Sequence, residues 1–123
     1  MTLGDFQRKF TFNIHLLIQF AYSQGYELTF GEAYRTQYQQ EQYFKEHKTE
    51  ILHSNHLNRL AIDFNLFKDG QLLITPFDFL PLGNYWMSLN TNNRWGGDWN
   101  RDYSLLNENF LDPYHFEMMP SSI

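Results

Sequence analysis

Between positions 60 and 67, apolar residues occupy every second position, and a turn signal follows directly. The apolar positions are Leu60, Ile62, Phe64 and Leu66. Alternation with period two is typical of a strand with one buried face, and the Asp69-Gly70 pair that follows indicates a tight hairpin turn. Apolar residues at 72–74 supply the second strand. The sequence therefore predicts a β-hairpin that carries Asp63 on the polar face of its first strand.

The first part of the chain has the spacing of a helix. Apolar residues at 6, 10, 14, 17 and 21 fall on one face of a helix with 3.6 residues per turn. Thr2 and Asp5 are the two candidates for its N-terminal cap, and Gly25 stands where such a helix ends. We therefore expect a helix over about residues 6–24.

The remaining segments mix helices and strands. They are predicted as a strand at 26–30, a polar surface helix at 36–48, a helix opening at Pro76, a loop at 90–101 and a last strand at 114–118. Pro81 is expected in the first turn of the third helix or at a break in it, because proline lacks the N–H that a helix interior uses. Without regular strand–helix–strand alternation, the fold class is α+β: a small antiparallel sheet with helices packed on one side. The length of 123 residues predicts one domain over 1–123.

Charge and composition exclude several classes of function. The chain has 9 Lys and Arg against 14 Asp and Glu, a net charge of −5, and no cysteine. An acidic chain without a basic cluster is a poor nucleic-acid binder, and the lack of cysteine excludes disulfides and thiolate metal sites. The first residues lack the pattern of a secretory signal, and no apolar stretch has the length of a membrane span. We therefore expect synthesis in a cytoplasm, without membrane insertion.

Two groups of polar residues have the composition of a metal site. The first is His56 followed by Asp63, and the second contains Asp112, His115 and Glu117. A catalytic zinc site commonly has three nitrogen or oxygen ligands and one open position, which His56, Asp63 and His115 would fill. Zinc lowers the pKa of a bound water from about 15.7 toward about 7, and a carboxylate outside the ligand set, here Asp112, then moves the proton. Glu117 would accept the second ring N–H of His115.

Each group by itself has a simpler explanation. His56 fits an ordinary loop histidine, and Asp63 fits a solvated position on a hairpin face. Residues 112–117 fit a terminal strand with its polar side chains toward water. A metal-dependent nuclease built on His56, Asn58 and Asp63 is disfavoured by the negative net charge.

Together, the two groups resemble the zinc-site signature of a family of peptidoglycan peptidases. The pattern Ser54-x-His56-x6-Asp63, followed by Asp112-x-x-His115, is similar to that of D-alanyl-D-alanine carboxypeptidases and dipeptidases and of phage L-alanyl-D-glutamate endopeptidases. The similarity extends over about residues 31–118.

Two further segments carry the same resemblance. Residues 31–36, which contain Arg35, are similar to a family segment that ends in an active-site arginine. The turn Trp95-Gly96-Gly97-Asp98-Trp99 is similar to one in the endopeptidase branch, where the glycines would let the backbone pass close to the cleft and a tryptophan would line it. One departure is Arg59, which stands where the family often has glycine.

The resemblance implies a role for each matching residue. The zinc ligands would be His56, Asp63 and His115. Asp112 would be the general base. Arg35 would stabilise the oxyanion or hold a carbonyl or carboxylate of the substrate. Ser54 would donate to the substrate or orient the loop.

The function implied by the resemblance is zinc-dependent hydrolysis of the peptide stem of bacterial peptidoglycan. The leading expectation is an L-alanyl-D-glutamate endopeptidase, a phage-type endolysin that acts as a monomer on the cell wall after release from the cytoplasm. A D-alanyl-D-alanine carboxypeptidase is the nearest enzymatic alternative, and a non-catalytic cell-wall-binding relative is the third. The expected cofactor is Zn²⁺ and the expected partner is the stem peptide, with no nucleic acid.

Overall fold

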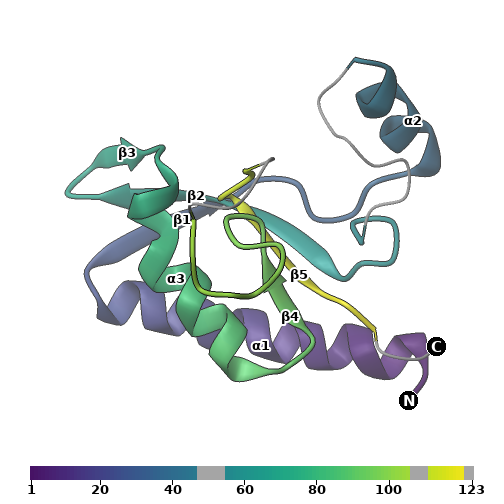
Figure 1. Ribbon diagram of the computed structural model, residues 1–123, viewed down its shortest axis with the longest axis horizontal. Coiled ribbons are helices and arrows are strands. Elements are labelled where there is room, and N and C mark those ends of the chain that lie inside the picture. Colours follow the sequence, from purple (N-terminus) through teal and green to yellow (C-terminus); the bar gives the residue numbers. More distant parts are fainter. Residues whose placement is uncertain (47–54, 106–110, 121–123) are drawn as a thin grey trace.

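The structure, a computed structural model, describes residues 1–46, 55–105 and 111–120. The elements within these ranges (Figure 1) are, in chain order, α1 (Leu3–Ser23), β1 (Tyr26–Phe30), α2 (Gln37–Lys45), β2 (Ala61–Lys68), β3 (Gln71–Leu73), α3 (Pro76–Leu89), β4 (Asn93–Trp95) and β5 (His115–Met118). The predicted α+β class is confirmed. The last two residues of the helix predicted at 36–48 lie outside the described ranges. None of the described helices is long and apolar enough to cross a membrane.

The strands form one open antiparallel sheet in the order β1-β2-β5-β4, with β3 also paired to β2. On the side away from β1, β2 pairs with β5 through its first residues and with β3 through its last ones. The predicted hairpin turn is confirmed. Asp69 and Gly70 both have positive φ, 52° and 77°, as a two-residue type I′ turn requires.

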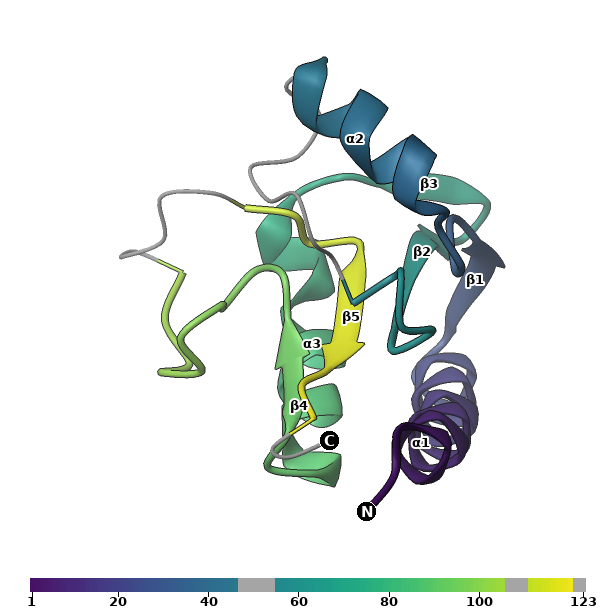
Figure 2. The same cartoon turned by 90° about the vertical axis from the view of Figure 1, so that its right-hand side faces the viewer.

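Helices α1 and α3 contact each other and pack on the same side of the sheet (Figure 2). The largest side chains buried in this core include Leu17, Phe64, Phe79, Trp86 and Phe116. The remaining helix, α2, stands apart from α1 and α3 (Figure 2). The candidate site lies on the other face of the sheet, along β2 and β5.

Helix α1 begins three residues before the predicted start because both candidate caps take part. The Thr2 hydroxyl accepts the backbone N–H of Asp5 at 3.1 Å, and the Asp5 carboxylate accepts the backbone N–H of Thr2 at 2.8 Å. This reciprocal capping box satisfies two N–H groups that the first turn leaves without helical partners.

Helix α3 differs from the prediction at Pro81. The proline lies inside the helix, beyond its first turn, and the helix continues to Leu89. The expectation of a first-turn position or a break is therefore wrong. The missing N–H removes one helical hydrogen bond, but complete burial of Phe79, Leu82 and Trp86 holds the helix on the sheet.

The loop predicted at 90–101 is wrong over three residues, because Asn93–Trp95 form strand β4. The strand is too short to show period two in the sequence, and its pairing with β5 decides its conformation. Trp95 is fully buried beside α3. A Cβ atom at Gly83 would lie 2.2 Å from the Trp95 ring, so α3 has glycine at this close approach.

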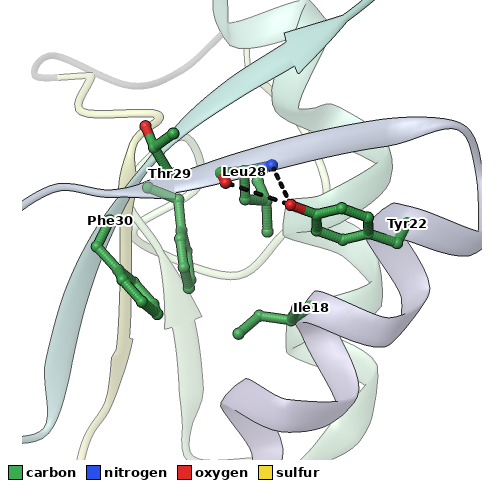
Figure 3. Close-up of a pocket in the computed structure, with 6 residues that line it drawn as sticks. Ile18, Tyr22, Leu28, Thr29 and Phe30 are labelled. Carbon is green, nitrogen blue, oxygen red and sulfur yellow. Dashed lines mark hydrogen bonds between the residues drawn. The ribbon is translucent and has the colours of Figure 1, made fainter.

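Strand β1 lies at one edge of the sheet, where backbone groups face outward. A side chain of α1 covers part of this edge (Figure 3). The backbone N–H of Leu28 donates to the Tyr22 hydroxyl at 3.3 Å, and the hydroxyl donates to the Leu28 carbonyl at 3.4 Å. The pair satisfies the polar groups that another strand would otherwise use.

Candidate metal centre

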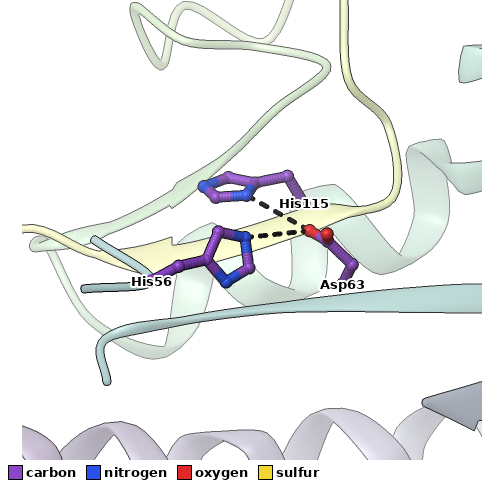
Figure 4. Close-up of side chains that lie close together, drawn as sticks. All are labelled: His56, Asp63 and His115. Carbon is purple, nitrogen blue, oxygen red and sulfur yellow. Dashed lines mark hydrogen bonds and ion pairs between the residues drawn. The ribbon is translucent and has the colours of Figure 1, made fainter. Parts of the chain in front are cut away.

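Two of the predicted ligands meet across a pair of strands. β2 and β5 pair so that Asp63 lies directly opposite His115. Their neighbours Ile62 and Phe116 are buried in the core, so alternation places Asp63 and His115 together on the face opposite α1 and α3. Oδ1 of Asp63 lies 3.3 Å from Nδ1 of His115 (Figure 4).

His56 reaches the same carboxylate from the turn that precedes β2. Its Nε2 lies 3.4 Å from Oδ1 of Asp63 (Figure 4), and its side chain is almost completely buried. Its Nδ1 lies 2.6 Å from the carbonyl oxygen of Ala33. Because a carbonyl only accepts, Nδ1 carries a proton, and Nε2 is the ring nitrogen turned toward Asp63.

The His115 ring is fixed from its other side by a carboxylate. Its Nε2 donates to Glu117 at 2.6 Å, as the sequence predicts. The second oxygen of Glu117 accepts a hydrogen bond from Nε of Arg94 at 2.9 Å and forms an ion pair with Nη2 at 2.7 Å. Arg94 lies opposite Glu117 on β4, so the misread strand supplies the counter-charge of this pair.

His56, Asp63 and His115 form a candidate metal site. The ligand atoms that they offer all lie within 4.8 Å of one another. Two imidazole nitrogens and a carboxylate oxygen are a common donor set for catalytic zinc. Each imidazole also gives its other nitrogen to an acceptor, Ala33 or Glu117, as metal-binding histidines usually do. The residues present therefore fit zinc.

The charges of the metal-free site are strongly coupled. Burial raises the pKa of Asp63, but hydrogen bonds from His115 and His56 outweigh it and hold that pKa well below its usual range. Burial lowers the pKa of His115, but hydrogen bonds to Asp63 and Glu117 overcome it and raise the pKa to about 9. Burial also raises the pKa of Glu117, but the hydrogen bonds and positive charges of His115 and Arg94 outweigh burial and lower that pKa. Without metal, His115 is therefore a protonated ring between two carboxylates.

The metal-free protein is expected to lose stability as the pH rises from about 6.5 to about 9. The folded-state pKa of His115 is raised to about 9 from an unfolded value near 6.5, so the stabilisation is complete below pH 6.5 and is lost through pH 9. The loss is on the order of 3 kcal/mol. Thermal unfolding in the presence of a chelator, at pH 6 and at pH 9, measures it. Zinc-loaded protein is the control, since zinc held by His115 would take the place of the ring proton. A chelated protein equally stable at both pH values would contradict the expectation.

Asp112 is half-buried beside these ligands. Burial raises the pKa of its carboxyl above the ordinary value, and the negative charge of Asp63 adds to the rise. The positive charges that oppose this rise belong to His115, His56 and Arg35. A raised pKa suits a carboxylate that must take and return a proton near neutral pH.

Gly96 holds the segment that carries Asp112 and His115. Its N–H donates to the His115 carbonyl at 2.8 Å, and its carbonyl accepts the Asp112 N–H at 2.9 Å. A Cβ atom at this position would lie 2.0 Å from the Asp112 carbonyl oxygen. The double glycine that the resemblance singled out therefore lets two backbones touch directly behind the site.

A Gly96→Ala variant is expected to be less stable and to bind zinc more weakly. The added methyl group must displace the Asp112 backbone, which costs about 1–3 kcal/mol of unfolding free energy and shifts His115. Chemical denaturation and zinc titration measure the two effects. Gly4→Ala is the matched control, because its nearest neighbour is the flexible end of Arg8. Equal stability of Gly96→Ala and wild type would show that the backbone yields there.

Arg35 is nearly buried, with 8% of the residue exposed. Its backbone N–H donates to the carbonyl of His56 at 3.3 Å. Its Nε forms an ion pair with Glu32, and its Nη1 donates to the Gln40 side chain at 2.5 Å. The Tyr43 ring lies 4.8 Å from the guanidinium carbon, and the Tyr43 hydroxyl donates to Glu32 at 3.0 Å.

Other residues singled out in the sequence have different outcomes. Ser54 lies outside the described residues. Trp95 is fully buried, whereas the half-buried Trp99 has its ring 5.3 Å from that of His115. Arg59 takes the left-handed conformation (φ 57°) that favours glycine, and its guanidinium stacks 4.2 Å from the Tyr34 ring.

The sequence reasoning missed several polar residues around the site. Those that hold Arg35 and Glu117 are Glu32, Gln40, Tyr43 and Arg94. The three-residue spacing of Glu32 and Arg35 is a signal for an ion pair in the sequence, but the same spacing also occurs in surface ion pairs. Arg94 has no such signal in the sequence, because it lies opposite Glu117 only once β4 is paired with β5.

Comparison with solved structures shows where this fold occurs. The chain superimposes on the Serratia marcescens L-Ala D-Glu endopeptidase ChiX with a TM-score of 0.69 and 16% identity, over 91% of this chain and 79% of ChiX. It also superimposes on a mutant of VanY, a vancomycin resistance D,D-pentapeptidase from a VanB-type resistance cassette in complex with Zn(II). That match has a TM-score of 0.57 and 17% identity, over 91% of this chain and 71% of VanY.

No protein-family model and no curated protein sequence matches the chain. The structural matches confirm the resemblance in the sequence at the level of fold. The chain therefore shares its fold with ChiX and with the zinc-bound VanY, and on this fold it carries a His-Asp-His candidate metal site.

Proposed function

We propose that this protein is a zinc-dependent peptidase that hydrolyses the peptide stem of bacterial peptidoglycan, with a single catalytic domain over residues 1–123. One observation carries the proposal. His56, Asp63 and His115 converge within 4.8 Å on a fold shared with ChiX and VanY. The outer hydrogen bonds that orient both imidazoles support a site built for a metal.

The remaining residues of the site have separate roles in this proposal. Bound zinc would supply a Lewis acid and lower the pKa of water toward neutrality. Asp112 takes a proton from the attacking water and returns one to the leaving amine nitrogen. Arg35 donates to the oxygen on which negative charge develops, from a guanidinium that Glu32 and Gln40 hold in place. Ser54 contacts the substrate.

The bond cleaved is proposed to be the one between L-Ala and D-Glu. The match to ChiX, an L-Ala D-Glu endopeptidase, has a higher TM-score and covers more of the relative than the match to VanY does. A D-alanyl-D-alanine carboxypeptidase is the second candidate, and the VanY match favours it. We further propose a phage-type endolysin that acts as a monomer on the wall after release from the cytoplasm.

The experiment that tests the function is digestion of purified peptidoglycan by zinc-loaded protein, with mass spectrometry of the released fragments. New N-terminal D-Glu on the fragments is the expected result. Release of terminal D-Ala alone would identify the carboxypeptidase instead. Binding to the wall without any cleavage would point to a non-catalytic relative. A sample treated with chelator is the control for dependence on metal.

A further inference from the structure

The charge of Arg35 is compensated inside the protein. Its guanidinium is ion-paired with Glu32, whose other oxygen accepts the Tyr43 hydroxyl. Both members of the pair are largely shielded from water, with side chains 10% and 27% exposed. A pair shielded in this way interacts more strongly than one on the surface, so Arg35 presents hydrogen-bond donors with little net positive charge.

The second arginine near the ligands is compensated in the same way. Arg94 donates a hydrogen bond to Glu117 and is ion-paired with it, and Glu117 also accepts a hydrogen bond from His115. Arg35 and Arg94 are therefore each paired with a carboxylate. Asp63 and Asp112 add negative charge close to each other, since the charge of Asp63 raises the pKa of the Asp112 carboxyl.

This charge pattern bears on the leaving side of the substrate. In the proposed function, Asp112 protonates the leaving nitrogen, so the groups attached to the next carbon lie close to Asp112. The positive charge of Arg35 also acts on the leaving side of the substrate, because it opposes the rise in the pKa of the Asp112 carboxyl. A free carboxylate on that carbon would meet a negative Asp112 and an already paired guanidinium, whereas an uncharged carboxamide would keep the hydrogen bonds without the repulsion.

We propose that Glu32 is a specificity-determining positioning residue that, by pairing with Arg35, adapts the site to a leaving residue with an uncharged α-carboxamide in place of a free α-carboxylate. This inference rests on the proposed function and refines it. In a stem that continues through the side chain of D-Glu, the α-carboxyl is the branch beside the cleaved bond, and it exists as carboxylate or as carboxamide. For a carboxypeptidase the same position is always a carboxylate, so the pairing also disfavours that activity.

The test uses two synthetic stem peptides that differ only in this group. For wild-type protein loaded with zinc, kcat/KM is expected to be at least about threefold higher for the carboxamide. In Glu32→Gln the amide oxygen still accepts from Arg35 but no longer compensates its charge, so the ratio is expected to move about tenfold toward the carboxylate. Glu32→Asp keeps the charge and is expected to keep the wild-type preference.

Glu41→Gln is the matched control, since Glu41 is exposed on α2 and the change removes the same charge. Its ratio is expected to equal that of wild type. Thermal unfolding reports whether each variant is folded. If Glu32→Gln does not fold, the ratio of the two kcat/KM values for wild type tests the inference by itself. A wild-type preference for the carboxylate, or a folded Glu32→Gln with an unchanged ratio, would overturn the inference. Cleavage of neither peptide by wild type would instead contradict the peptidase activity, and the specificity with it.

Discussion

An Asp112→Asn protein is expected to keep its zinc and lose most of its activity. The amide has the shape of the carboxyl group but cannot take a proton from water, and general acid–base groups contribute about 10²- to 10⁴-fold to such reactions. Asp112 does not belong to the group that offers metal ligands, so zinc binding should remain within a few-fold of wild type. Metal analysis and the rate of stem-peptide cleavage, measured on the same sample, separate the two properties.

The matched control for this variant is Asp69→Asn. It makes the same chemical change in the hairpin turn, where asparagine also tolerates the positive φ of the position. Its activity is expected to equal that of wild type. An Asp112→Asn enzyme with wild-type kcat would remove Asp112 from the chemistry, and one that lost its zinc would make it a ligand.

A His56→Ala protein is expected to lose both zinc and activity. The substitution removes one of three donors, whereas loss of an outer hydrogen-bond partner alone already costs roughly 10- to 100-fold in metal affinity. The reduction should therefore exceed that range, and the cleavage rate should fall to background. Zinc titration against a competing chelator measures the affinity directly.

His15→Ala is the control for the histidine change, because His15 is exposed on α1. Both its zinc content and its activity are expected to be those of wild type. Stoichiometric zinc in His56→Ala, at unchanged affinity, would show that the metal binds without this side chain.

The parts of the fold that could be predicted are those with local signals. The first helix, the strand at 26–30 and the hairpin around Asp69-Gly70 each contain their own period or turn residues, and all three are present. The grouping of His56, Asp63 and His115 was predicted because the pattern lies in short segments with fixed spacing. A turn and two paired strands then bring these segments together.

The parts that could not be predicted depend on tertiary contacts. Strand β4 has no period of its own and exists because β5 pairs with it. The helix through Pro81 depends on burial against the sheet, which outweighs the lost hydrogen bond. The surroundings of Arg35 depend on Gln40 and Tyr43, side chains of a separate helix.

The candidate metal ligands on β2 and β5 alternate with residues that fill the interior. Asp63 stands between Ile62 and Phe64, and Phe116 stands between His115 and Glu117. A slip of either strand by one residue would exchange the two sets, turning phenylalanine outward and carboxylates inward. The energy that drives apolar side chains out of water therefore also selects the orientation of the candidate ligands. A chain with a misaligned strand would fail to fold, so it would not persist as a folded protein with a defective site.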